Sequence, residues 1–296
     1  MGVICQANAR LEPKREKGCA RPAALRFLTF LAPKLFPFYE FLTNYLAKSL
    51  GCKARLLVGT GYDQLSTDCD VAYVCGLPYV ESTRWRNPPV EPLAAPVLLG
   101  DRYRGRPIYF SDVIVRRDST LRSFADLRGC RWAYNEPHSQ SGYGITRYHL
   151  ARLGESGGYF GSMVEAGFHE RAIGMVCSGA ADAAAIDSHL LAVAMRDRPE
   201  LVRQLRTIDT LGPSTIQPVV AARRLPRRLK TKLRQAFLEI GGNPHAQPYL
   251  KRALVQRFVP VTDSSYDDIR RMLAAVGPAS RGFSISTVEV GEHGHG

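Results

Sequence analysis

The stretch from residue 137 to 142, Pro-His-Ser-Gln-Ser-Gly, combines residue types that can hold an anion. It lies between a predicted strand at 131–135 and a helical pattern at 145–154. The hydroxyl groups of Ser139 and Ser141, together with the free backbone N–H groups of the first helical turn, can donate hydrogen bonds to an oxyanion, and the helix dipole adds to the attraction. The same serines can instead cap the helix. The stretch alone therefore leaves an anion site and a purely structural turn both open.

Motifs for other chemistries are absent from the sequence. There is no nucleotide loop of the form GxxxxGK[ST], no GxSxG nucleophile elbow and no HExxH zinc motif. His138 and His149 lie near the serines in the sequence, but their spacing specifies no catalytic triad. The seven cysteines contain no CxxC pair, so we expect free thiols rather than a structural zinc site. We predict neither a metal nor a cofactor.

Strand and helix patterns alternate around this stretch. The predicted strands cover residues 25–30, 55–58, 70–75, 96–99, 108–115, 131–135 and 182–186, and the predicted helices cover 38–50, 145–154 and 169–178. This alternation predicts an α/β fold with mostly parallel sheets. The strand at 108–115 is long and alternating, which suits a segment that crosses between two such layers. Two layers joined in this way suggest a hinged cleft.

Length and composition agree with two globular lobes. The chain has 296 residues, which is long for one ordinary domain. Hydrophobic residues make up 45% and charged residues 23%, a composition typical of globular proteins and not of intrinsically disordered chains. No apolar run approaches the roughly 20 residues of a membrane-spanning helix. We therefore do not expect a transmembrane protein.

The net charge of +13 suggests a nucleic acid or an anionic membrane as partner, but its distribution weakens that interpretation. Residues 1–26 hold six Lys/Arg against two Asp/Glu, and residues 195–234 hold eleven against three, so the rest of the chain is nearly neutral. From Arg227 to Arg234 the cations interleave with leucines at helical spacing. We interpret this segment as the exposed face of an amphipathic helix, with docking to an acidic partner or a membrane as the alternative, and we expect no nucleic-acid partner.

The two ends of the chain look like tails. We predict a disordered basic tail at residues 1–24 and a flexible C-terminal tail at 278–296. The first segment contains no apolar core of 7–15 residues, so no secretory signal is visible in it. A cytoplasmic location therefore stays open beside an exported one.

Five stretches, in this order, resemble the substrate-binding proteins of phosphate, phosphite and phosphonate ABC transporters, within the type II periplasmic-binding-protein superfamily. They are Phe27–Phe36, Tyr109–Ser119, Trp132–Gly142, Glu165–Arg171 and Ser178–Ser188, and the resemblance extends over residues 25–277. It implies an α/β fold of two lobes, each a mostly parallel sheet flanked by helices, with the ligand cleft between them. The implied lobe 1 comprises residues 25–107 and 217–277, and the implied lobe 2 comprises residues 108–216.

The resemblance also implies ligand contacts at the stretch described first. Ser139, Gln140, Ser141 and Gly142 match a serine-rich turn at a helix start that holds phosphoryl oxygens. His169 matches a histidine that reaches the same oxygens. Neutral donors of this kind suit a phosphoryl group, because hydrogen bonds to an oxyanion are about twice as strong as neutral ones. The structural alternative for His169 is a residue that simply begins its helix.

Three further positions extend the implied site. Tyr62 and Tyr109 match tyrosines that line the cleft and donate hydroxyl hydrogen bonds, with ordinary core aromatics as the alternative. Asp187 corresponds to a region where relatives that bind aminoalkyl phosphonates place a carboxylate, with a helix cap as the alternative. Gln217, in the second such region, brings no charge. We therefore expect a compact anion rather than an aminoethyl ligand.

These observations predict a binding protein and not an enzyme. We expect a monomeric solute-binding protein that captures phosphate, phosphite or a small phosphonate for an ABC transporter permease, in the periplasm or at the cell surface. One alternative keeps the fold and makes the protein an intracellular ligand sensor, because no signal segment is visible and the cysteines are predicted to be free. Another is an enzyme of the same superfold, such as a thiamine-pyrimidine synthase-like protein, although the dense Cys/His motif of those proteins is missing.

Overall fold

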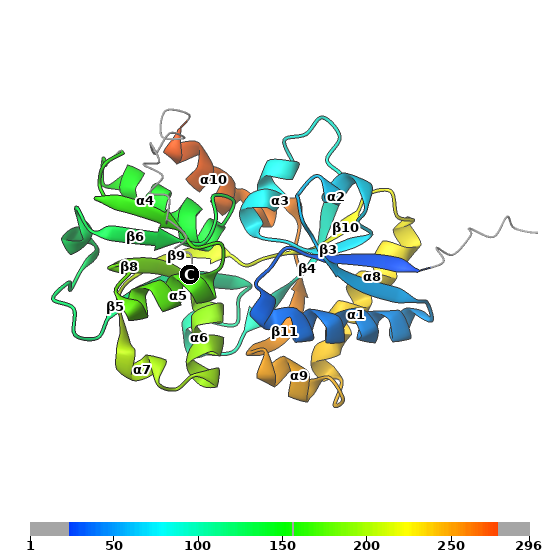
Figure 1. Cartoon of the computed structure of the whole chain (residues 1–296). Helices are drawn as coiled ribbons and strands as arrows, with labels where there is room; N and C mark the ends of the chain where they lie inside the picture. Colours follow the sequence, from blue (N-terminus) through cyan, green and yellow to red (C-terminus); the bar gives the residue numbers. More distant parts are fainter. Residues whose placement is uncertain (1–23, 156, 278–296) are drawn as a thin grey trace, which may run out of the picture.

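The structure, a computed structural model, describes residues 24–155 and 157–277. These residues form two lobes that lie side by side, each a β-sheet covered by helices (Figure 1). The predicted two-lobed α/β fold is therefore confirmed. The tails predicted at 1–24 and 278–296 lie outside the described residues, apart from residue 24. Among the described helices, none has both the length and the apolar character needed to cross a membrane.

Lobe 1 is built on a six-stranded sheet with the order β11-β4-β10-β3-β1-β2. Its strands are β1 (Leu25–Thr29), β2 (Ala54–Val58), β3 (Val71–Tyr73), β4 (Val90–Leu98), β10 (Val219–Ala222) and β11 (Val255–Pro260). Its helices are α1 (Phe36–Leu50), α2 (Gln64–Thr67), α3 (Gly76–Ser82), α8 (Arg227–Glu239) and α9 (Gln247–Arg252), and the last described helix, α10 (Asp267–Val276), packs against both lobes.

Lobe 2 is built on a five-stranded sheet with the order β7-β6-β8-β5-β9. Its strands are β5 (Ile108–Arg116), β6 (Arg131–Tyr134), β7 (Ser162–Glu165), β8 (Ala183–Asp187) and β9 (Leu205–Thr215). Its helices are α4 (Ile145–Arg152), α5 (His169–Ser178), α6 (Ser188–Asp197) and α7 (Leu201–Gln204).

Both sheets are mixed, so the expectation of mostly parallel sheets is wrong. In lobe 1, β1 pairs in parallel with β2 and β3, but β10 and β11 pair antiparallel. In lobe 2, β6 is parallel to β7 and β8, whereas β5 is antiparallel to β8 and β9. Strands β5 and β10 enter their sheets from the other lobe and not through a local strand–helix–strand crossover, which is the connection that makes neighbouring strands parallel. Strand β11 follows β10 within lobe 1 and runs in the same direction, so it is antiparallel to β4 as well.

The strand at 108–115 does not cross between the lobes, contrary to the expectation. It is β5, which lies between β8 and β9 inside the lobe 2 sheet. The chain instead passes between the sheets in the segments 99–107 and 216–218, which follow β4 and β9.

The bounds of the helix predicted after the first strand follow from the local sequence. Helix α1 begins just after Pro33 and ends at Gly51, which adopts a left-handed conformation with φ +60°. Its buried positions Phe38, Leu42 and Leu46 recur at helical spacing and face the sheet. The predicted helix at 38–50 is therefore confirmed.

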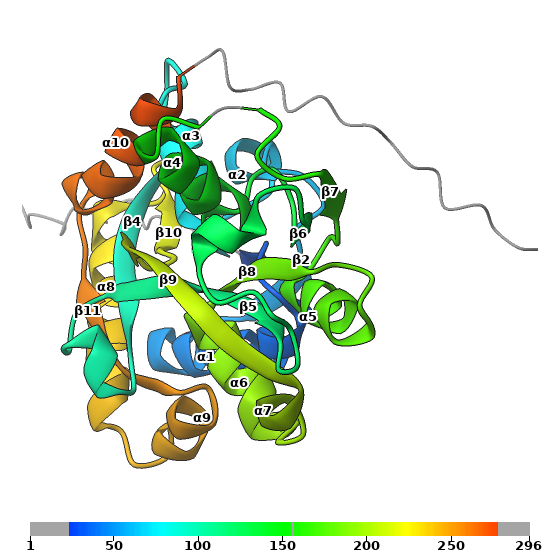
Figure 2. The same cartoon turned by 90° about the vertical axis from the view of Figure 1, so that its left-hand side faces the viewer.

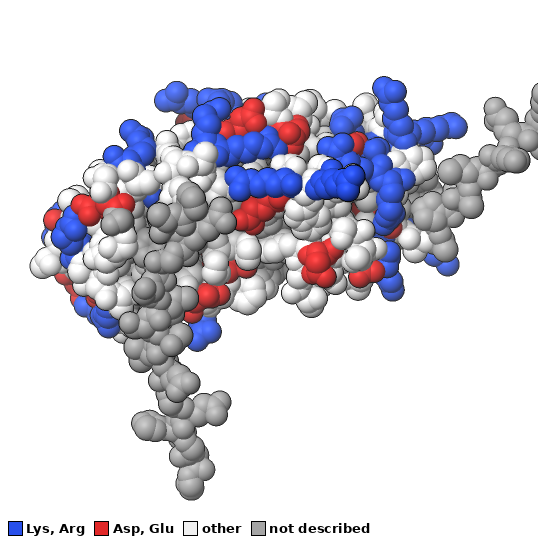
Figure 3. Space-filling model, turned by 90° about the horizontal axis from the view of Figure 1, so that it is seen from above, with Lys and Arg blue, Asp and Glu red and all other residues white. Residues whose placement is uncertain are grey.

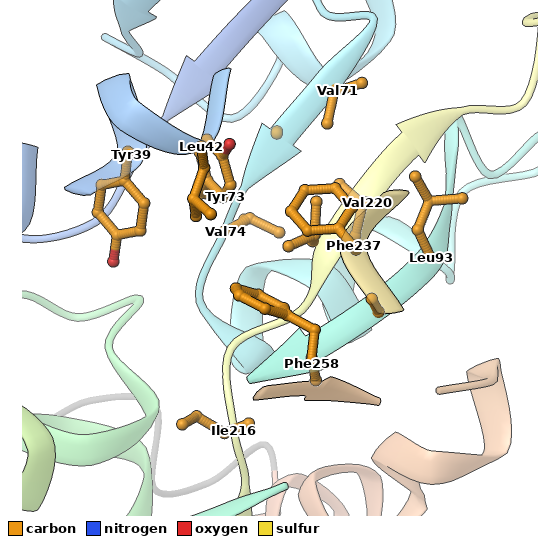
Figure 4. Close-up of a cluster of buried hydrophobic side chains, with 14 of the residues drawn as sticks. Tyr39, Leu42, Val71, Tyr73, Val74, Leu93, Ile216, Val220, Phe237 and Phe258 are labelled. Carbon is orange, nitrogen blue, oxygen red and sulfur yellow. The ribbon is translucent and has the colours of Figure 1, made fainter. Parts of the chain in front are cut away.

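The lobe 1 core is formed between the sheet and the helices that cover it. Figure 4 shows Phe237 from α8 directed at Val220 of the central strand β10, and its ring lies 5.1 Å from that of Phe258 on β11. Helix α10 joins this core to the core of lobe 2, because Ile269 packs in the first and Met272 in the second. Figure 2 shows α10 beside α4 of lobe 2. The C-terminal helix thus contacts both lobes.

Candidate functional site

A pocket of about 300 Å³ lies between the two lobes. Its walls come from the segments that directly follow β1, β2 and β3 in lobe 1 and β6, β7 and β8 in lobe 2. In each sheet these three strands are mutually parallel, so their carboxyl ends meet at one edge, which is where ligands bind in open α/β sheets. The polar residues that line the pocket are Tyr39, Thr60, Tyr62, Cys75, Asn135, Glu136, Ser139, Ser141, Glu165, His169, Asp187, His189 and Gln217.

The serine turn forms the lobe 2 floor of this pocket. Ser139 caps the helix start by accepting a hydrogen bond from the backbone N–H of Gly142 at 3.1 Å. Residues Gln140–Gly144 then form one π-helical turn that leads into α4. Such turns are rare and frequently occur at functional sites. Ser139 Oγ lies 3.3 Å from Ser141 Oγ, and both serines line the pocket although they are almost fully buried.

His169 meets this turn from the start of α5. Its Nε2 lies 2.9 Å from Ser141 Oγ, although the two residues are 28 positions apart in the chain. Burial lowers the pKa of His169 to about 4, because the charged imidazolium loses its hydration inside the protein. The ring is therefore neutral near pH 7 and offers one N–H. Its buried Nδ1 has no hydrogen-bond partner among the described residues.

Gln140 and Gly142 do not line the pocket. The Gln140 side chain is 1% exposed and donates to Ser214 Oγ and Met272 Sδ, both at 3.2 Å, so it is directed into the protein. A Cβ atom on Gly142 would lie 2.0 Å from Asn135 Oδ1. The glycine therefore makes room for a neighbouring side chain rather than for a ligand. The structure places both residues in the framework of the turn.

The two candidate tyrosines occupy different environments. Tyr62 lines the pocket from lobe 1, and its hydroxyl donates to Glu136 Oε1 of lobe 2 at 3.1 Å. Tyr109, on β5, is 1% exposed and lies behind the pocket wall. Burial raises the pKa of Tyr109 well above its usual value, and nearby Ser141 opposes that rise. The Tyr109 hydroxyl nevertheless makes no hydrogen bond of normal geometry to the described residues.

Asp187 lines the pocket, and it also caps α6, which is the structural role that we gave as the alternative for this residue. Its Oδ1 accepts from the backbone N–H groups of His189 and Leu190, at 2.8 and 3.3 Å. Its Oδ2 accepts from Gln217 Nε2 at 2.6 Å, which joins lobe 2 to the segment that returns to lobe 1. Both carboxylate oxygens therefore already have donors within the protein.

Several lining residues were not singled out from the sequence. Asn135, Glu136 and Glu165 follow β6 or end β7, and Cys75 follows β3. Burial raises the pKa of Glu136, and Glu165 adds to that rise, while the hydrogen bond from Tyr62 lowers it. The signal that could have found these residues is their place directly after a strand, which they share with the serine turn.

The charged side chains of the pocket wall are the carboxyl groups of Glu136, Glu165 and Asp187, and among the described residues no Lys or Arg lines it. Its donors are hydroxyl, imidazole, amide and backbone N–H groups. Within the same described part of the chain, no group of three or more His, Cys, Asp or Glu side chains is arranged to hold a metal ion. An anion bound here would therefore be held by neutral hydrogen-bond donors, which form strong bonds to oxyanions once water is excluded.

Comparison with known proteins identifies the family. The family of periplasmic substrate-binding proteins of phosphonate ABC transporters matches residues 29–266. The chain belongs to this family. Its members are the ligand-binding components of a transporter and not enzymes, so the function expected from the sequence, a solute-binding protein for ABC transporter uptake, is confirmed. The family is also periplasmic, in agreement with the expected location.

Individual members resemble the chain over most of its length. The phosphonates-binding periplasmic protein of Escherichia coli (strain K12) is 25% identical over 252 residues, which are 82% of this chain and 71% of the relative. A binding-protein component of an ABC phosphonate transporter from Pseudomonas aeruginosa superposes with a TM-score of 0.74 at 21% identity, covering 84% of this chain and 85% of the other. The structure of PhnD1 from Prochlorococcus marinus in complex with methylphosphonate superposes with a TM-score of 0.74 at 19% identity. The match covers 85% of this chain and 97% of the other. At these identities the two structures establish the shared fold.

Proposed function

We propose that the pocket holds a small phosphonate, or a closely related phosphorus oxyanion, with its phosphoryl oxygens at Ser139, Ser141 and His169. The observation that carries this proposal is the convergence of two hydroxyls and one neutral imidazole, linked by contacts of 3.3 and 2.9 Å, in a pocket between the lobes. The names of the Escherichia coli and Prochlorococcus marinus relatives, which include phosphonates and methylphosphonate, support the same ligand class.

The donors around the pocket match the needs of a phosphoryl group. Its three oxygens accept several hydrogen bonds, and donors on short, rigid turns meet them with little loss of side-chain entropy. Tyr62 would approach from lobe 1, and Tyr109 would stabilise the turn from behind through Ser141. Gln140 and Gly142 stabilise the shape of the turn, and the Gln140 side chain would not contact the ligand.

Closure of the lobes would retain the ligand. We propose that residues 25–107 with 217–277, and residues 108–216, move as two bodies about the segments that connect the sheets. A ligand that contacts both bodies binds the closed arrangement more tightly, and this difference in affinity stabilises closure. In the described arrangement the Tyr62 hydroxyl already reaches Glu136 across the pocket.

Asp187 bears on the size and charge of the ligand. Its two oxygens accept three hydrogen bonds from the protein, one of them from Gln217 at 2.6 Å. An ammonium group at this position would have to displace the Gln217 amide. We therefore propose a compact anion, with no ammonium group at Asp187.

Isothermal titration calorimetry with methylphosphonate, phosphite and phosphate tests the ligand class. We expect saturable binding of one ligand per chain to at least one of them, together with a rise in melting temperature that grows with ligand concentration. 2-Aminoethylphosphonate, which adds an ammonium group, should bind more weakly than methylphosphonate. Absence of both heat and thermal shift with all of these ligands would overturn the proposed ligand class.

We further propose that the protein acts as a monomer that delivers its ligand to a membrane permease. Its family provides the ABC transporter context, and the ligand pocket is complete within one chain. Size-exclusion chromatography with light scattering tests the monomer. Fractionation of the producing cells tests export: recovery in the periplasm or on the cell surface is the expected result, and recovery in the cytoplasm would favour an intracellular sensor.

A further inference from the structure

The amino ends of several lobe 1 strands meet at the edge of the sheet that lies opposite the pocket. Strands β1, β2 and β3 are parallel, so residues 24–26, 53–55 and 68–70 lie along this edge. Strand β10 runs antiparallel to β3, so its last residue, Ala222, and the start of α8 reach the same edge. The backbone N–H of Ala222 donates to Asp70 O at 2.9 Å, which ties the two segments together.

These segments bring cations from distant parts of the chain into one place, which we call the basic edge. It consists of Arg26, Lys53, Arg55, Arg223, Arg224, Arg227 and Arg228. Figure 3 shows many Lys and Arg side chains toward the right-hand end of the molecule, which is the lobe 1 end in Figure 1. The span from β10 to β2 is three strand spacings, or about 14 Å, so the cations lie within one compact surface.

The acidic residues at this edge do not neutralise it. Asp68 pairs with Arg26 at 2.9 Å, Asp70 with Arg224 at 2.8 Å, and Glu91 with Lys230 of α8 at 3.0 Å. Each nearby carboxylate is thus already paired.

The remaining cations are exposed and face water. They are Lys53, Arg55, Arg227 and Arg228, and none of them forms an ion pair with any residue in 24–155 or 157–277. Lys232, one helical turn after Arg228, is exposed and equally without an ion pair within those ranges. The basic edge therefore carries uncompensated positive charge, in contrast to the pocket, which no Lys or Arg lines among the described residues.

We propose that the basic edge binds the surface of an anionic lipid bilayer. The family works with a membrane transporter, so a membrane is the extended anionic surface that such a protein meets. Each cation near a bilayer rich in anionic lipid raises partition by about fivefold. Because the edge lies opposite the carboxyl ends of β1 to β3, contact with lipid leaves the pocket accessible. Binding of this kind would hold the loaded protein near its transporter.

Sedimentation of the full chain with vesicles tests this proposal. Vesicles of neutral phosphatidylcholine are compared with vesicles that also contain phosphatidylglycerol, at about 0.05 M and 0.5 M salt. The test variant is Arg227→Gln, Arg228→Gln and Lys232→Gln together. The matched control is Arg171→Gln, Arg203→Gln and Lys251→Gln, three exposed cations on α5, α7 and α9. Thermal melting and methylphosphonate calorimetry of both variants check that the fold and the pocket are unchanged.

We expect the unaltered chain to sediment with the anionic vesicles at low salt and to be released at high salt. The test variant should partition about a hundredfold more weakly, whereas the control variant should lose no more than a few-fold. Equal loss in both variants, or equal binding to neutral vesicles, would overturn the proposal. Binding of a fluorescent single-stranded oligonucleotide is measured as well. If the unaltered chain binds it more tightly than the vesicles, and only the test variant loses that binding, the surface is assigned to nucleic acid and the proposal is overturned.

Discussion

Ser141 Oγ lies 2.9 Å from His169 Nε2, and this contact joins the turn after β6 to the start of the helix after β7. Both side chains are almost fully buried, and both line the pocket. Neither local segment alone could form the donor set that we assign to the phosphoryl group. The parallel pairing of β6 and β7 brings the two together, because it places the carboxyl ends of both strands at the same edge.

Replacement of Ser141 by alanine tests the assigned phosphoryl site. A hydrogen bond to a charged group contributes about 1.5–3 kcal/mol, so we expect Ser141→Ala to weaken methylphosphonate binding by roughly 10- to 100-fold in calorimetry. Ser178→Ala is the matched control, because the exposed Ser178 hydroxyl bonds only to neighbouring backbone: it donates to Met175 O and accepts from the N–H of Ala180. Unchanged affinity in Ser141→Ala would remove this hydroxyl from the site.

The neutral state of His169 predicts a dependence of stability on pH. Its pKa is about 4 in the folded protein and about 6.5 in the unfolded chain, so the unfolded chain binds more protons between these values. The free energy of unfolding should therefore fall as the pH drops from 6.5 to 4, by at most about 1.4 kcal/mol per pH unit from this group.

Urea unfolding of the ligand-free protein at several pH values measures this effect. In His169→Gln the fall should be smaller than in the unaltered chain. His138→Gln, which changes a half-exposed ring near Glu81, is the control and should keep most of the fall. Buried His189 also has a lowered pKa, and it contributes to the pH dependence of both the unaltered chain and His169→Gln. The difference between these two proteins therefore reports on His169 alone. Parallel curves for His169→Gln and the unaltered chain would contradict the neutral buried state.

The close approach of Asn135 to Gly142 predicts a cost for any side chain at that glycine. A Cβ at position 142 would lie 2.0 Å from Asn135 Oδ1, so Gly142→Ala forces the turn to shift. We expect a loss of about 1–3 kcal/mol in the free energy of unfolding, together with weaker ligand binding.

Gly174→Ala is the matched control for this substitution. Gly174 lies inside α5, and a Cβ there meets nothing within 4 Å. Alanine at this position should stabilise the protein by about 0.5–1 kcal/mol, since glycine is the poorer helix former. If chemical denaturation showed equal changes in the free energy of unfolding for Gly142→Ala and Gly174→Ala, the inference that the serine turn is tightly packed at Gly142 would be wrong.

The hydrogen bond from Tyr62 to Glu136 connects the lobes across the pocket at 3.1 Å. Tyr62→Phe removes this bond and leaves the ring in place, so we expect ligand to dissociate about 2- to 10-fold faster, in line with about 0.5–1.5 kcal/mol for one such bond. Stopped-flow measurement of release provides the rate. Tyr249→Phe is a suitable control, because that exposed ring stacks on Phe41 far from the pocket. A release rate equal to that of the control would argue against a bond that retains the ligand.

Local sequence patterns predicted many of the elements, although the strands β7, β9, β10 and β11 were not among them. Apolar spacing and a terminal glycine predicted α1, and the turn of residues 137–142 was recognised as the end of a strand and the start of a helix. These features depend on neighbouring residues, whose conformational preferences act over a few positions. The strand pairing was not predictable in the same way. Strand β10 is antiparallel because it returns from the other lobe, and no local pattern records that path.

The directions of the candidate side chains also depended on distant contacts. Gln140 belongs to the serine turn, yet Ser214 and Met272 direct its side chain into the protein. Asp187 lies at the pocket, but Gln217 occupies one of its oxygens. Asn135 and Glu136 lie in the pocket wall because β6, which they follow, pairs with β7 and β8.

The sequence by itself determined the two-lobed α/β class, the serine turn and the residue types available to hold an anion, because these follow from periodicity and local chain geometry. The tertiary structure decided which of those residues meet, since the meeting of Ser141 with His169, or of Tyr62 with Glu136, requires segments 28 and 74 residues apart to be placed by strand pairing and lobe packing. It likewise decided that the cations of distant segments gather at one edge of lobe 1 while the pocket walls that the structure describes hold no Lys or Arg.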